Sequence, residues 1–227
     1  RTCGYNVCEE PVANWNVSDD SGNQHNVLNA FYKHPSKYAC TFQTLVLRTR
    51  IEQAKALQGE RGFVERCIHS DHLFGTVQHQ LGNMDDVEYA TYLYQFQQAV
   101  RDNPTPIRGF IYIKTSVDTC LSRIAKRDRA GEKQVTKAYL SLLEEAHETW
   151  LCKKKFPDNV LVIDGEKAFD QSTIKSMVDP FKRMLWKEED TTLLCHDCNM
   201  YQRQAANLVA GTQYCFRCHA RRRKKAR

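Results

Sequence analysis

The stretch Phe110-Ile111-Tyr112-Ile113 is the clearest strand in the sequence, and the segments that follow it set the fold class. An apolar run of this length, bounded by polar residues, is typical of a buried strand. Ser116 is a good helix cap, and the sequence predicts a helix from Val117 to about Arg127. A further helix over residues 136–153 leads to a second strand, Asn159 to Ile163. Strands that alternate with helices favour a parallel sheet covered on both faces by helices, so we predict an α/β fold.

The same alternation extends towards both ends of the chain. Residues 85–102 open with two acidic residues, which the positive end of a helix dipole favours, and Pro104 and Pro106 end that helix. The pattern stops at residues 188–190, so we predict an α/β domain over residues 1–190. The remaining predicted elements are a strand from Tyr5 to Cys8, a helix over 41–58, a strand over 62–64 and a helix from Ser172 to Lys187.

Composition and charge narrow the class of protein. The 227 residues are 41% hydrophobic, and because no apolar run approaches the roughly 20 residues of a membrane span, we expect no membrane segment. The net charge is +6, and the tail at 221–227 contains six basic residues, which leaves 27 basic and 27 acidic residues elsewhere. A neutral body argues against a protein that binds nucleic acid over its whole surface. The tail itself fits a phosphate-binding arm, a nuclear import signal or a solvated end equally well.

The ten cysteines fall into two groups. Six are scattered through the α/β domain, and without a secretory signal we expect them to be reduced in an intracellular protein, with the cytoplasm as its compartment and the nucleus as the alternative. The other four, Cys195, Cys198, Cys215 and Cys218, form two Cys-x2-Cys pairs. Two such pairs can present four thiolates tetrahedrally to Zn²⁺, and a module of about 30 residues needs such a metal to fold. We therefore predict a zinc ribbon over residues 191–220.

Three groups of polar residues in the α/β domain are candidate functional residues, and each has an ordinary structural alternative. Glu10 follows a strand, where open α/β sheets place their active sites, although an acid in a surface loop is also common. Gln43 and Arg50 share one helix face, which suits either a planar heterocycle or an ordinary amphipathic helix. An arginine cluster near a helix end suits either an anionic ligand or a solvated surface: Arg123, Arg127 and Arg129.

The order of several short motifs resembles that of the deoxynucleoside kinase family. The resemblance covers roughly residues 4–188, and the combination of motifs is specific where no single motif would be. It implies an α/β kinase fold, ATP-dependent phosphorylation of a deoxynucleoside 5′-hydroxyl in nucleotide salvage, and Mg²⁺ with the ATP. The motifs are Glu10-Pro11-Val12-Ala13-Asn14-Trp15, Phe31-Tyr32-Lys33-His34-Pro35, Thr41-Phe42-Gln43-Thr44, Glu65-Arg66-Cys67-Ile68-His69-Ser70-Asp71, Thr119-Cys120-Leu121-Ser122-Arg123-Ile124, Arg127-Asp128-Arg129 and His147-Glu148-Thr149-Trp150.

The resemblance also implies roles for residues that meet the transferred phosphoryl group. Glu10 matches the carboxylate that accepts the proton of the attacking 5′-hydroxyl. Glu65 and Arg66 match a Glu-Arg pair near the reacting phosphate and its magnesium ion. Three lid arginines neutralise the phosphate charge, and one aromatic residue lies beside the ATP adenine: Arg123, Arg127, Arg129 and Phe169.

The remaining roles that the resemblance implies concern the nucleoside. Gln43 matches the amide that pairs with the nucleobase edge, while Tyr32 and Glu132 match the pair that holds the sugar 3′-hydroxyl. Arg50 and Asp71 match positions that are Arg and Asp in the deoxycytidine and deoxyguanosine kinase branch. Because a charged pair there can hold a cytosine or purine edge, we expect deoxycytidine and purine deoxynucleosides to be preferred over thymidine.

The sequence departs from the family pattern at three places. Cys67 stands where Ser is usual, and His72 where Arg or Lys is common. No Gly-x-x-x-x-Gly-Lys-Ser/Thr loop, whose backbone N–H groups and lysine bind ATP phosphates, occurs among the 227 residues. In the family that loop and the first strand precede the position of Glu10. We therefore expect this chain to be a fragment of an active kinase, with a degenerate copy as the alternative.

Two alternatives to an active deoxynucleoside kinase remain open. The first is a catalytically inactive kinase-like protein whose zinc ribbon and basic tail bind nucleic acid or an acidic protein partner, because residues 191–227 carry eight Lys and Arg against one Asp. The second is a nucleoside monophosphate kinase, which would need a further arginine clamp for the acceptor phosphate. The resemblance also implies a homodimer, an assembly that is common in the family.

Overall fold

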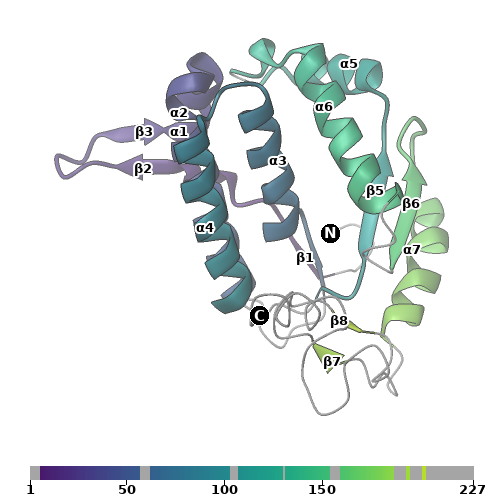
Figure 1. The fold of residues 1–227 in the computed structure, drawn as a ribbon. Helices are drawn as coiled ribbons and strands as arrows, with labels where there is room; N and C mark the ends of the chain where they lie inside the picture. The colour runs from purple at the N-terminus through teal and green to yellow at the C-terminus, as the bar shows by residue number, and fades with distance from the viewer. Residues whose placement is uncertain are drawn as a thin grey trace.

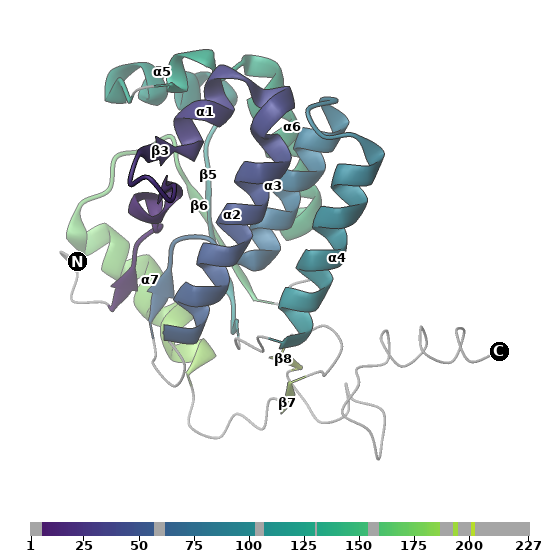
Figure 2. The same ribbon diagram turned by 90° about the vertical axis from the view of Figure 1, so that its left-hand side faces the viewer.

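The computed structural model describes residues 6–56, 62–102, 107–129, 131–153, 159–186, 193–194 and 201–202. Its helices and longer strands form two halves (Figures 1 and 2). The first half consists of four helices, α1 (Val27–Lys33), α2 (Pro35–Ala56), α3 (Ile68–Gln80) and α4 (Asp86–Asp102). The second half consists of the strands β5 (Phe110–Lys114) and β6 (Val160–Asp164) and the helices α5 (Val117–Arg127), α6 (Lys137–His147) and α7 (Gln171–Leu185).

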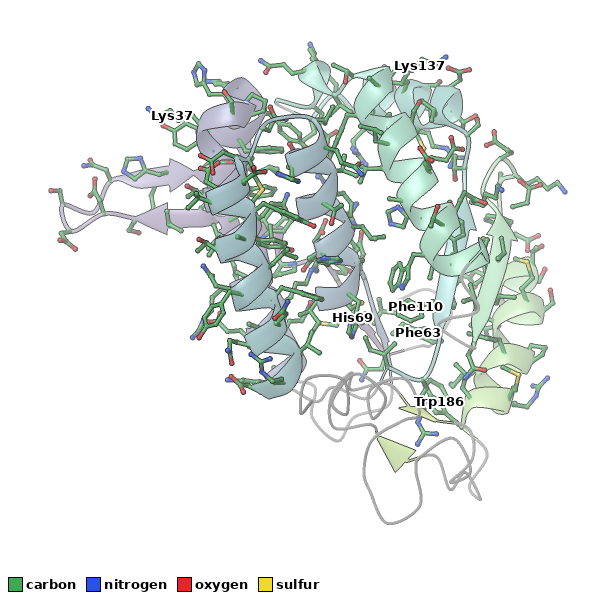
Figure 3. The ribbon with its side chains drawn as sticks, in the orientation of Figure 1. Lys37, Phe63, His69, Phe110, Lys137 and Trp186 are labelled. Atoms are coloured by element: carbon green, nitrogen blue, oxygen red, sulfur yellow. The ribbon has the colours of Figure 1, made fainter. Side chains whose placement is uncertain are left out.

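The strands of the α/β alternation pair in parallel, as the sequence predicts. β1 (Val7–Cys8) pairs with β4 (Phe63–Val64), and β5 pairs with β6 in a register that sets Phe110 opposite Val160. Within the described ranges the two pairs are separate two-stranded sheets rather than one sheet. The β1–β4 pair is tied to α7 by Phe63, whose ring centroid lies 5.9 Å from that of Trp186 (Figure 3). The α/β class is therefore confirmed.

The prediction of a fully buried strand at residues 110–113 is wrong. Phe110, Ile111 and Tyr112 are only half-buried, and Ile113 is 57% exposed. In the part of the chain that the structure describes, β5 has a neighbouring strand on one side only, so its other edge has no hydrogen-bonded partner strand. The apolar run indicates a strand correctly, but it does not report how many neighbours that strand has.

The helices of the second half begin at capping side chains, of which the sequence analysis predicted Ser116. Ser116 accepts a hydrogen bond from the backbone N–H of Thr119 at 3.3 Å and begins α5, and Asp170 does the same for Thr173 at the start of α7. Thr136 begins α6 in the same way. The helix predicted over 136–153 changes character near its end, where a π-helix, η3 (Glu148–Lys153), follows α6.

The core of the first half is built around aromatic rings on α1 and α2 and on a 3-10 turn, η1 (Val12–Trp15). Phe42 stacks on Phe31 at 5.0 Å and meets Trp15 edge-on at 5.2 Å. The Trp15 indole N–H donates to Thr49 Oγ1 at 3.2 Å, so its polar group is satisfied although the side chain is buried. α2 begins at Pro35, earlier than the predicted residue 41, because proline is well tolerated in the first turn of a helix.

A β-hairpin that the sequence analysis missed projects from the first half (Figure 1). It consists of β2 (Asn16–Ser18) and β3 (Gln24–Asn26), which pair in an antiparallel register. Asp19 holds the turn, since its carboxylate accepts the backbone N–H groups of Ser21 and Asn23, each at 2.9 Å. Both strands are exposed, and Val17 is their one apolar residue, so they lack the apolar alternation that marks a half-buried strand.

The structure describes little after residue 186. The strands β7 (Leu193–Leu194) and β8 (Tyr201–Gln202) form a short antiparallel pair. The predicted boundary at 188–190 and the four cysteines of the predicted zinc ribbon lie outside the described residues. Across the described ranges, none of the helices combines the length and the apolar character needed to cross a bilayer. The five cysteines that are described, Cys8, Cys40, Cys67, Cys120 and Cys152, are free thiols, as expected.

Candidate active site

The carboxyl ends of β1 and β4 bring two acidic segments together. The parallel register sets Cys8 opposite Val64, so the residues that follow each strand become neighbours. The backbone N–H of Glu65 donates to the carbonyl of Cys8 at 2.9 Å, and the backbone N–H of Glu10 lies 3.4 Å from Glu65 Oε2. Glu10 and Glu65, which are 55 residues apart in the chain, therefore lie at one edge of the strand pair, as the sequence predicts for a site in an α/β fold.

Arg50 extends from α2 into this edge and joins three segments. Its side chain is almost completely buried, and its guanidinium donates to the carboxylate of Glu10 and, at 2.9 Å, to the backbone carbonyl of Glu65. Arg50 Nε lies 3.4 Å from Asp71 Oδ2, which is close enough for an ion pair but is not aligned as a hydrogen bond. One buried cation thus compensates two carboxylates.

Asp71 is the most unusual titrating group in the site. It lies in the first turn of α3 and is 1% exposed. Burial raises the pKa of Asp71 to about 6, because a charge removed from water is disfavoured, while Arg50 and Arg66 lower it. The carboxylate is therefore held in its charged form near neutral pH mainly by two arginines.

Arg66 reaches the carboxylate of Glu10 from the turn between β4 and α3. Its φ of 65° lies in the left-handed region, which costs a non-glycine residue roughly 1–3 kcal/mol and is frequent at functional sites. The guanidinium packs over the Phe74 ring, 4.4 Å from its centroid, and Nη1 lies 3.6 Å from Glu10 Oε1. The strained backbone thus points a half-exposed cation at Glu10.

The two departures in this region leave the surrounding contacts intact. Ser70 Oγ accepts the backbone N–H of Cys67 at 3.0 Å at the start of α3, and burial raises the pKa of the Cys67 thiol to about 11. Cys67 is therefore a neutral thiol rather than a reactive thiolate. His72 stacks on Phe96 of α4 at 4.7 Å, so it joins α3 to α4.

A second cluster of charges gathers around Glu132, in the 3-10 turn η2 (Glu132–Gln134). Glu132 is buried, and Arg127 binds it through two parallel hydrogen bonds, Nε to Oε2 and Nη2 to Oε1, both 3.0 Å long. Arg129 Nη1 lies 3.4 Å from the same carboxylate. Two of the predicted lid arginines are therefore paired with one of the predicted sugar-binding residues.

Tyr32 connects the second cluster with the first. Gly131, with a φ of 86°, lies against it: a Cβ at Gly131 would be 3.0 Å from the Tyr32 ring. Burial and the Glu132 carboxylate raise the pKa of Tyr32, while Arg66, Arg129 and Arg127 act in the opposite direction. Arg66, which faces Glu10, and the two arginines paired with Glu132 therefore all favour the charged form of Tyr32.

The predicted ATP-binding residues lie on α5 and on the segment after β6. Arg123, one helical turn before Arg127, donates to the carbonyl of Gly165 at 2.6 Å. In the same segment Glu166 accepts the backbone N–H of Ser116 at 2.6 Å, which ties the start of α5 to the end of β6. Phe169 follows in this segment and is half-buried.

Gln43 and Gln53 complete the region on α2. Gln43 is buried two turns before Arg50, on the same face of the helix, as predicted. Gln53 was missed by the sequence analysis, yet its Nε2 donates to the carbonyl of Glu9 at 2.7 Å. Its spacing of three residues from Arg50 was the only signal that could have indicated it. The amide side chains of Gln43 and Gln53 therefore lie on the same face of α2 as the buried Arg50.

Among the residues that the structure describes, no three His, Cys, Asp or Glu side chains are grouped so as to hold a metal ion by themselves. Glu10 and Glu65 nevertheless offer carboxylate oxygens at the strand ends. Mg²⁺ is commonly bound through one or two carboxylates and the oxygens of substrate phosphates. This donor set fits such a shared ion.

Comparisons with known proteins agree with this arrangement. A profile of the deoxynucleoside kinase family matches residues 1–185. A probable deoxycytidine kinase of fowlpox virus is 37% identical over 183 residues, which are 77% of this chain and 75% of that protein. The human mitochondrial thymidine kinase 2 is 31% identical over 171 residues, which are 73% of this chain and 63% of that protein.

A solved structure supports the same relationship at the level of the fold. The deoxyadenosine kinase of M. mycoides with bound dCTP aligns with a TM-score of 0.65 and 25% identity, over 79% of this chain and 86% of that chain. These relatives are named for three different nucleosides, so they have a common fold and a common type of reaction rather than a common base. The chain belongs to the deoxynucleoside kinase family, and the protein is a kinase, an enzyme that transfers phosphoryl groups.

Proposed function

We propose that this protein transfers the γ-phosphoryl group of ATP to the 5′-hydroxyl of a deoxynucleoside. The observation that carries the proposal is the position of Glu10, which contacts Arg50 and faces Arg66, while Arg127 and Arg129 both pair with Glu132. A carboxylate close to several cations is the arrangement that an attacking alcohol and a migrating anion need.

Glu10 is the group that we assign to the attacking hydroxyl. In phosphoryl transfer the carboxylate mainly orients the alcohol and accepts its proton, because the transition state is loose. Arg50 holds the Glu10 carboxylate in place from the buried side, and Arg66 faces it from the half-exposed side. Arg66 therefore has the freedom to turn towards a phosphate, while Arg50 stays in place.

Arg127 and Arg129 are the cations that we assign to the transferred phosphoryl group. Both are paired with Glu132 and both are about half-exposed. Arg127 forms a bidentate pair with Glu132, which is stronger than the single contact of Arg129. A phosphate can therefore draw Arg129 away from Glu132 with a smaller loss of interaction energy than Arg127. Glu132 then keeps Arg127 oriented and, with Tyr32, remains available to the sugar 3′-hydroxyl.

The ATP side is assigned to Arg123 and Phe169, with Mg²⁺ as the metal ion. Arg123 is held by the carbonyl of Gly165, in the same segment as Phe169. When bound, Mg²⁺ supplies positive charge that compensates the phosphate oxygens. Glu65 is the residue of this chain that we expect to bind the ion.

We further propose a preference for deoxycytidine and purine deoxynucleosides over thymidine. Gln43, Arg50 and Asp71 are all buried, and Arg50 and Asp71 lie at ion-pair distance. Cytosine, adenine and guanine carry an amino group that can donate a hydrogen bond to a buried carboxylate, whereas thymine offers a carbonyl oxygen at the equivalent edge. The amide of Gln43 can donate and accept with either kind of base, so Asp71 supplies the discrimination.

Phosphate transfer is the decisive experiment, with protein produced from the complete reading frame that contains these residues. Labelled ATP is supplied with deoxycytidine, deoxyguanosine, deoxyadenosine, thymidine or deoxycytidine monophosphate. We expect Glu10→Gln to lower kcat by about 10²–10⁴-fold, while Glu9→Gln, its exposed neighbour, leaves kcat unchanged. Transfer to the monophosphate alone would replace the proposal by a nucleotide kinase. No transfer together with salt-sensitive DNA binding would indicate the inactive, nucleic-acid-binding alternative.

We also propose that Cys195, Cys198, Cys215 and Cys218 bind one Zn²⁺, which stabilises a ribbon next to the basic tail. The support is the spacing of the two Cys-x2-Cys pairs alone. Elemental analysis of the purified protein should give about one zinc per chain. Cys195→Ser with Cys198→Ser should abolish it, while Cys152→Ser, an exposed thiol outside the pairs, should not. A metal content unchanged by the double substitution would contradict the assignment.

A homodimer is the assembly that we propose. Its support is one face of α4, where Val87 is 75% exposed and Tyr94, two turns later, is 63% exposed. Light scattering should give twice the mass of the chain. Val87→Asp with Tyr94→Asp should shift the protein towards a monomer, and a monomeric wild-type protein would contradict the proposal.

A further inference from the structure

The start of α5 is held by one carboxylate that lies outside the helix. Glu166 follows β6, 50 residues after Ser116 in the chain. Its Oε1 accepts the backbone N–H of Ser116 and its Oε2 accepts the hydroxyl of Thr119, each at 2.6 Å. Hydrogen bonds to an ionised acceptor are roughly twice as strong as neutral ones. Both oxygens of Glu166 therefore hold the first turn of α5.

The helix does not need Glu166 for its own cap. Ser116 Oγ already accepts the backbone N–H of Thr119 at 3.3 Å, which is the ordinary N-cap bond. The two bonds to Glu166 instead join α5 to the segment that follows β6. They therefore fix where α5 lies rather than whether it forms.

Apolar packing contributes little to the position of α5. The structure describes all eleven residues of this helix, and Val117 is the one that is buried. A helix of a globular protein is usually held in place by an apolar stripe that faces the core. The position of α5 therefore depends strongly on its polar contacts with neighbouring segments.

The segment that holds α5 is itself packed closely against the end of β5. Gly165 is buried, its N–H donates to the carbonyl of Lys114 at 2.6 Å, and a Cβ there would lie 2.0 Å from Thr115 Oγ1. The carbonyl of Gly165 also accepts Arg123 Nη2 at 2.6 Å. α5, which lies above the carboxyl ends of β5 and β6 in Figure 1, is thus tied to this segment through Glu166 and, two turns later, through Arg123.

We propose that Glu166 is a positioning residue for phosphoryl transfer, which holds α5 where Arg127 can reach the transferred phosphoryl group. This inference rests on the function proposed above. Arg127 lies one turn after Arg123 on the same side of α5, so a shift of the helix displaces both guanidinium groups. Cations stabilise a migrating phosphate only from the correct position, and a displacement of about 1 Å can cost about 10²-fold in rate.

The rival explanation is that Glu166 is an ordinary surface acid. Its side chain is exposed, and exposed charges usually contribute little to stability. The hydrogen bonds from Ser116 and Thr119 lower the pKa of Glu166, so its carboxylate is charged near neutral pH under either explanation. The two explanations differ in the kinetics, because removal of a surface acid leaves the use of ATP unchanged, whereas removal of a positioning residue impairs it and spares nucleoside binding.

The test compares Glu166→Ala with Asp118→Ala. Asp118 is the matched control, because it is an acid in the first turn of the same helix whose partner, Lys137, is exposed. We expect Glu166→Ala to lower kcat/KM for ATP by about 10-fold or more and to weaken ATP binding, measured by calorimetry, by about 5-fold or more. The dissociation constant for deoxycytidine should change by less than about 2-fold, and Asp118→Ala should change each quantity by less than about 2-fold.

Three further variants separate positioning from general damage. Glu166→Gln keeps an acceptor for the Ser116 N–H, so it should retain clearly more activity than Glu166→Ala. Thr119→Val removes one of the two donors without a change at Glu166, and it should show a smaller loss that is again specific for ATP. In an Arg127→Ala background, Glu166→Ala should lower kcat/KM for ATP by less than about 2-fold, since the residue through which it acts is absent.

Each outcome decides the inference separately from the proposed function. Equal effects of Glu166→Ala and Asp118→Ala on ATP would overturn it, as would a full additional loss in the Arg127→Ala background or an equal loss of nucleoside binding. If Glu166→Ala does not fold, Thr119→Val decides in its place. If the wild-type protein phosphorylates a nucleotide but no nucleoside, the proposed function fails while kcat/KM for ATP still judges Glu166. If it binds no ATP, both are overturned.

Discussion

The buried guanidinium of Arg50 is the point at which one substitution tests the site most directly. Arg50→Met keeps much of the side-chain volume but removes the charge that faces Glu10, Asp71 and the Glu65 carbonyl. Removal of one partner of a buried ion pair leaves an uncompensated charge, and such changes cost about 3–5 kcal/mol. We expect the free energy of unfolding at pH 8 to fall by about this amount.

The pH dependence of this loss follows from Asp71. Burial raises the pKa of Asp71 to about 6 and Arg50 lowers it, so removal of Arg50 raises it further. A group whose pKa is higher in the folded state stabilises that state when protonated, and the contribution is lost as the pH rises through the folded pKa. At pH 5 the carboxyl is mostly protonated with or without Arg50. The loss should therefore be smaller at pH 5 than at pH 8, by about 1–3 kcal/mol, because each pK unit is worth about 1.4 kcal/mol.

Urea unfolding at pH 5 and pH 8, followed by tryptophan fluorescence and circular dichroism, measures both quantities. The control is Arg48→Met, since Arg48 lies on the same helix in an exposed pair with Glu52 and should contribute less than about 0.5 kcal/mol. Asp71→Asn in the Arg50→Met background should restore part of the stability at pH 8. A loss below about 1 kcal/mol at pH 8, or an equal loss at both pH values, would refute the reasoning.

Three further substitutions test the packing, the caps and the half-buried His69. Gly75→Ala forces a methyl group against the Tyr92 ring, so thermal melting should show a destabilisation of about 1–3 kcal/mol, and a neutral result would mean that α4 moves freely. Ser116→Ala removes the cap that accepts the Thr119 N–H, so urea unfolding should show a free energy of unfolding that is lower by about 1 kcal/mol. A decrease of no more than about a few tenths of a kcal/mol would mean that α5 does not need this cap. Burial lowers the pKa of His69 to about 4, so the neutral folded form loses stability as the pH falls from about 6.5 towards 4. His69→Phe should therefore lose less stability than the wild type between pH 7 and pH 4.5, and parallel urea titrations would contradict this.

The local elements of this chain were predictable because their determinants are local. Ser116 begins α5 and the acidic pair at residues 85–86 lies at the start of α4, as the sequence indicates. The hairpin formed by β2 and β3 was missed although Asp19 and Gly22 are typical turn residues. Its strands are exposed and, apart from Val17, polar, so hydrogen bonds of the turn and between the strands hold them in register rather than an apolar alternation.

The environment of each element was less predictable than its type. The apolar run at Phe110 predicted a strand but not its half-exposed carboxyl end, because burial depends on which neighbours a strand acquires in space. The helix over 136–153 was predicted without its π-helical end at Glu148–Lys153, since the apolar spacing that reveals a helix does not distinguish one helical hydrogen-bond pattern from another.

The sequence by itself determined the α/β class, the positions of α2, α4, α5, α6 and α7 but not of α1 and α3, and, through the order of motifs, the candidate residues Glu10, Arg50 and Asp71. Only the tertiary structure decided that one arginine is buried between two carboxylates, and that Tyr92, which no motif contains, packs against Gly75 of α3. The reason is physical. Periodicity and capping act between residues a few positions apart, whereas the charge state of Asp71 depends on burial and on side chains that only the packing of α2, α3 and α4 brings together.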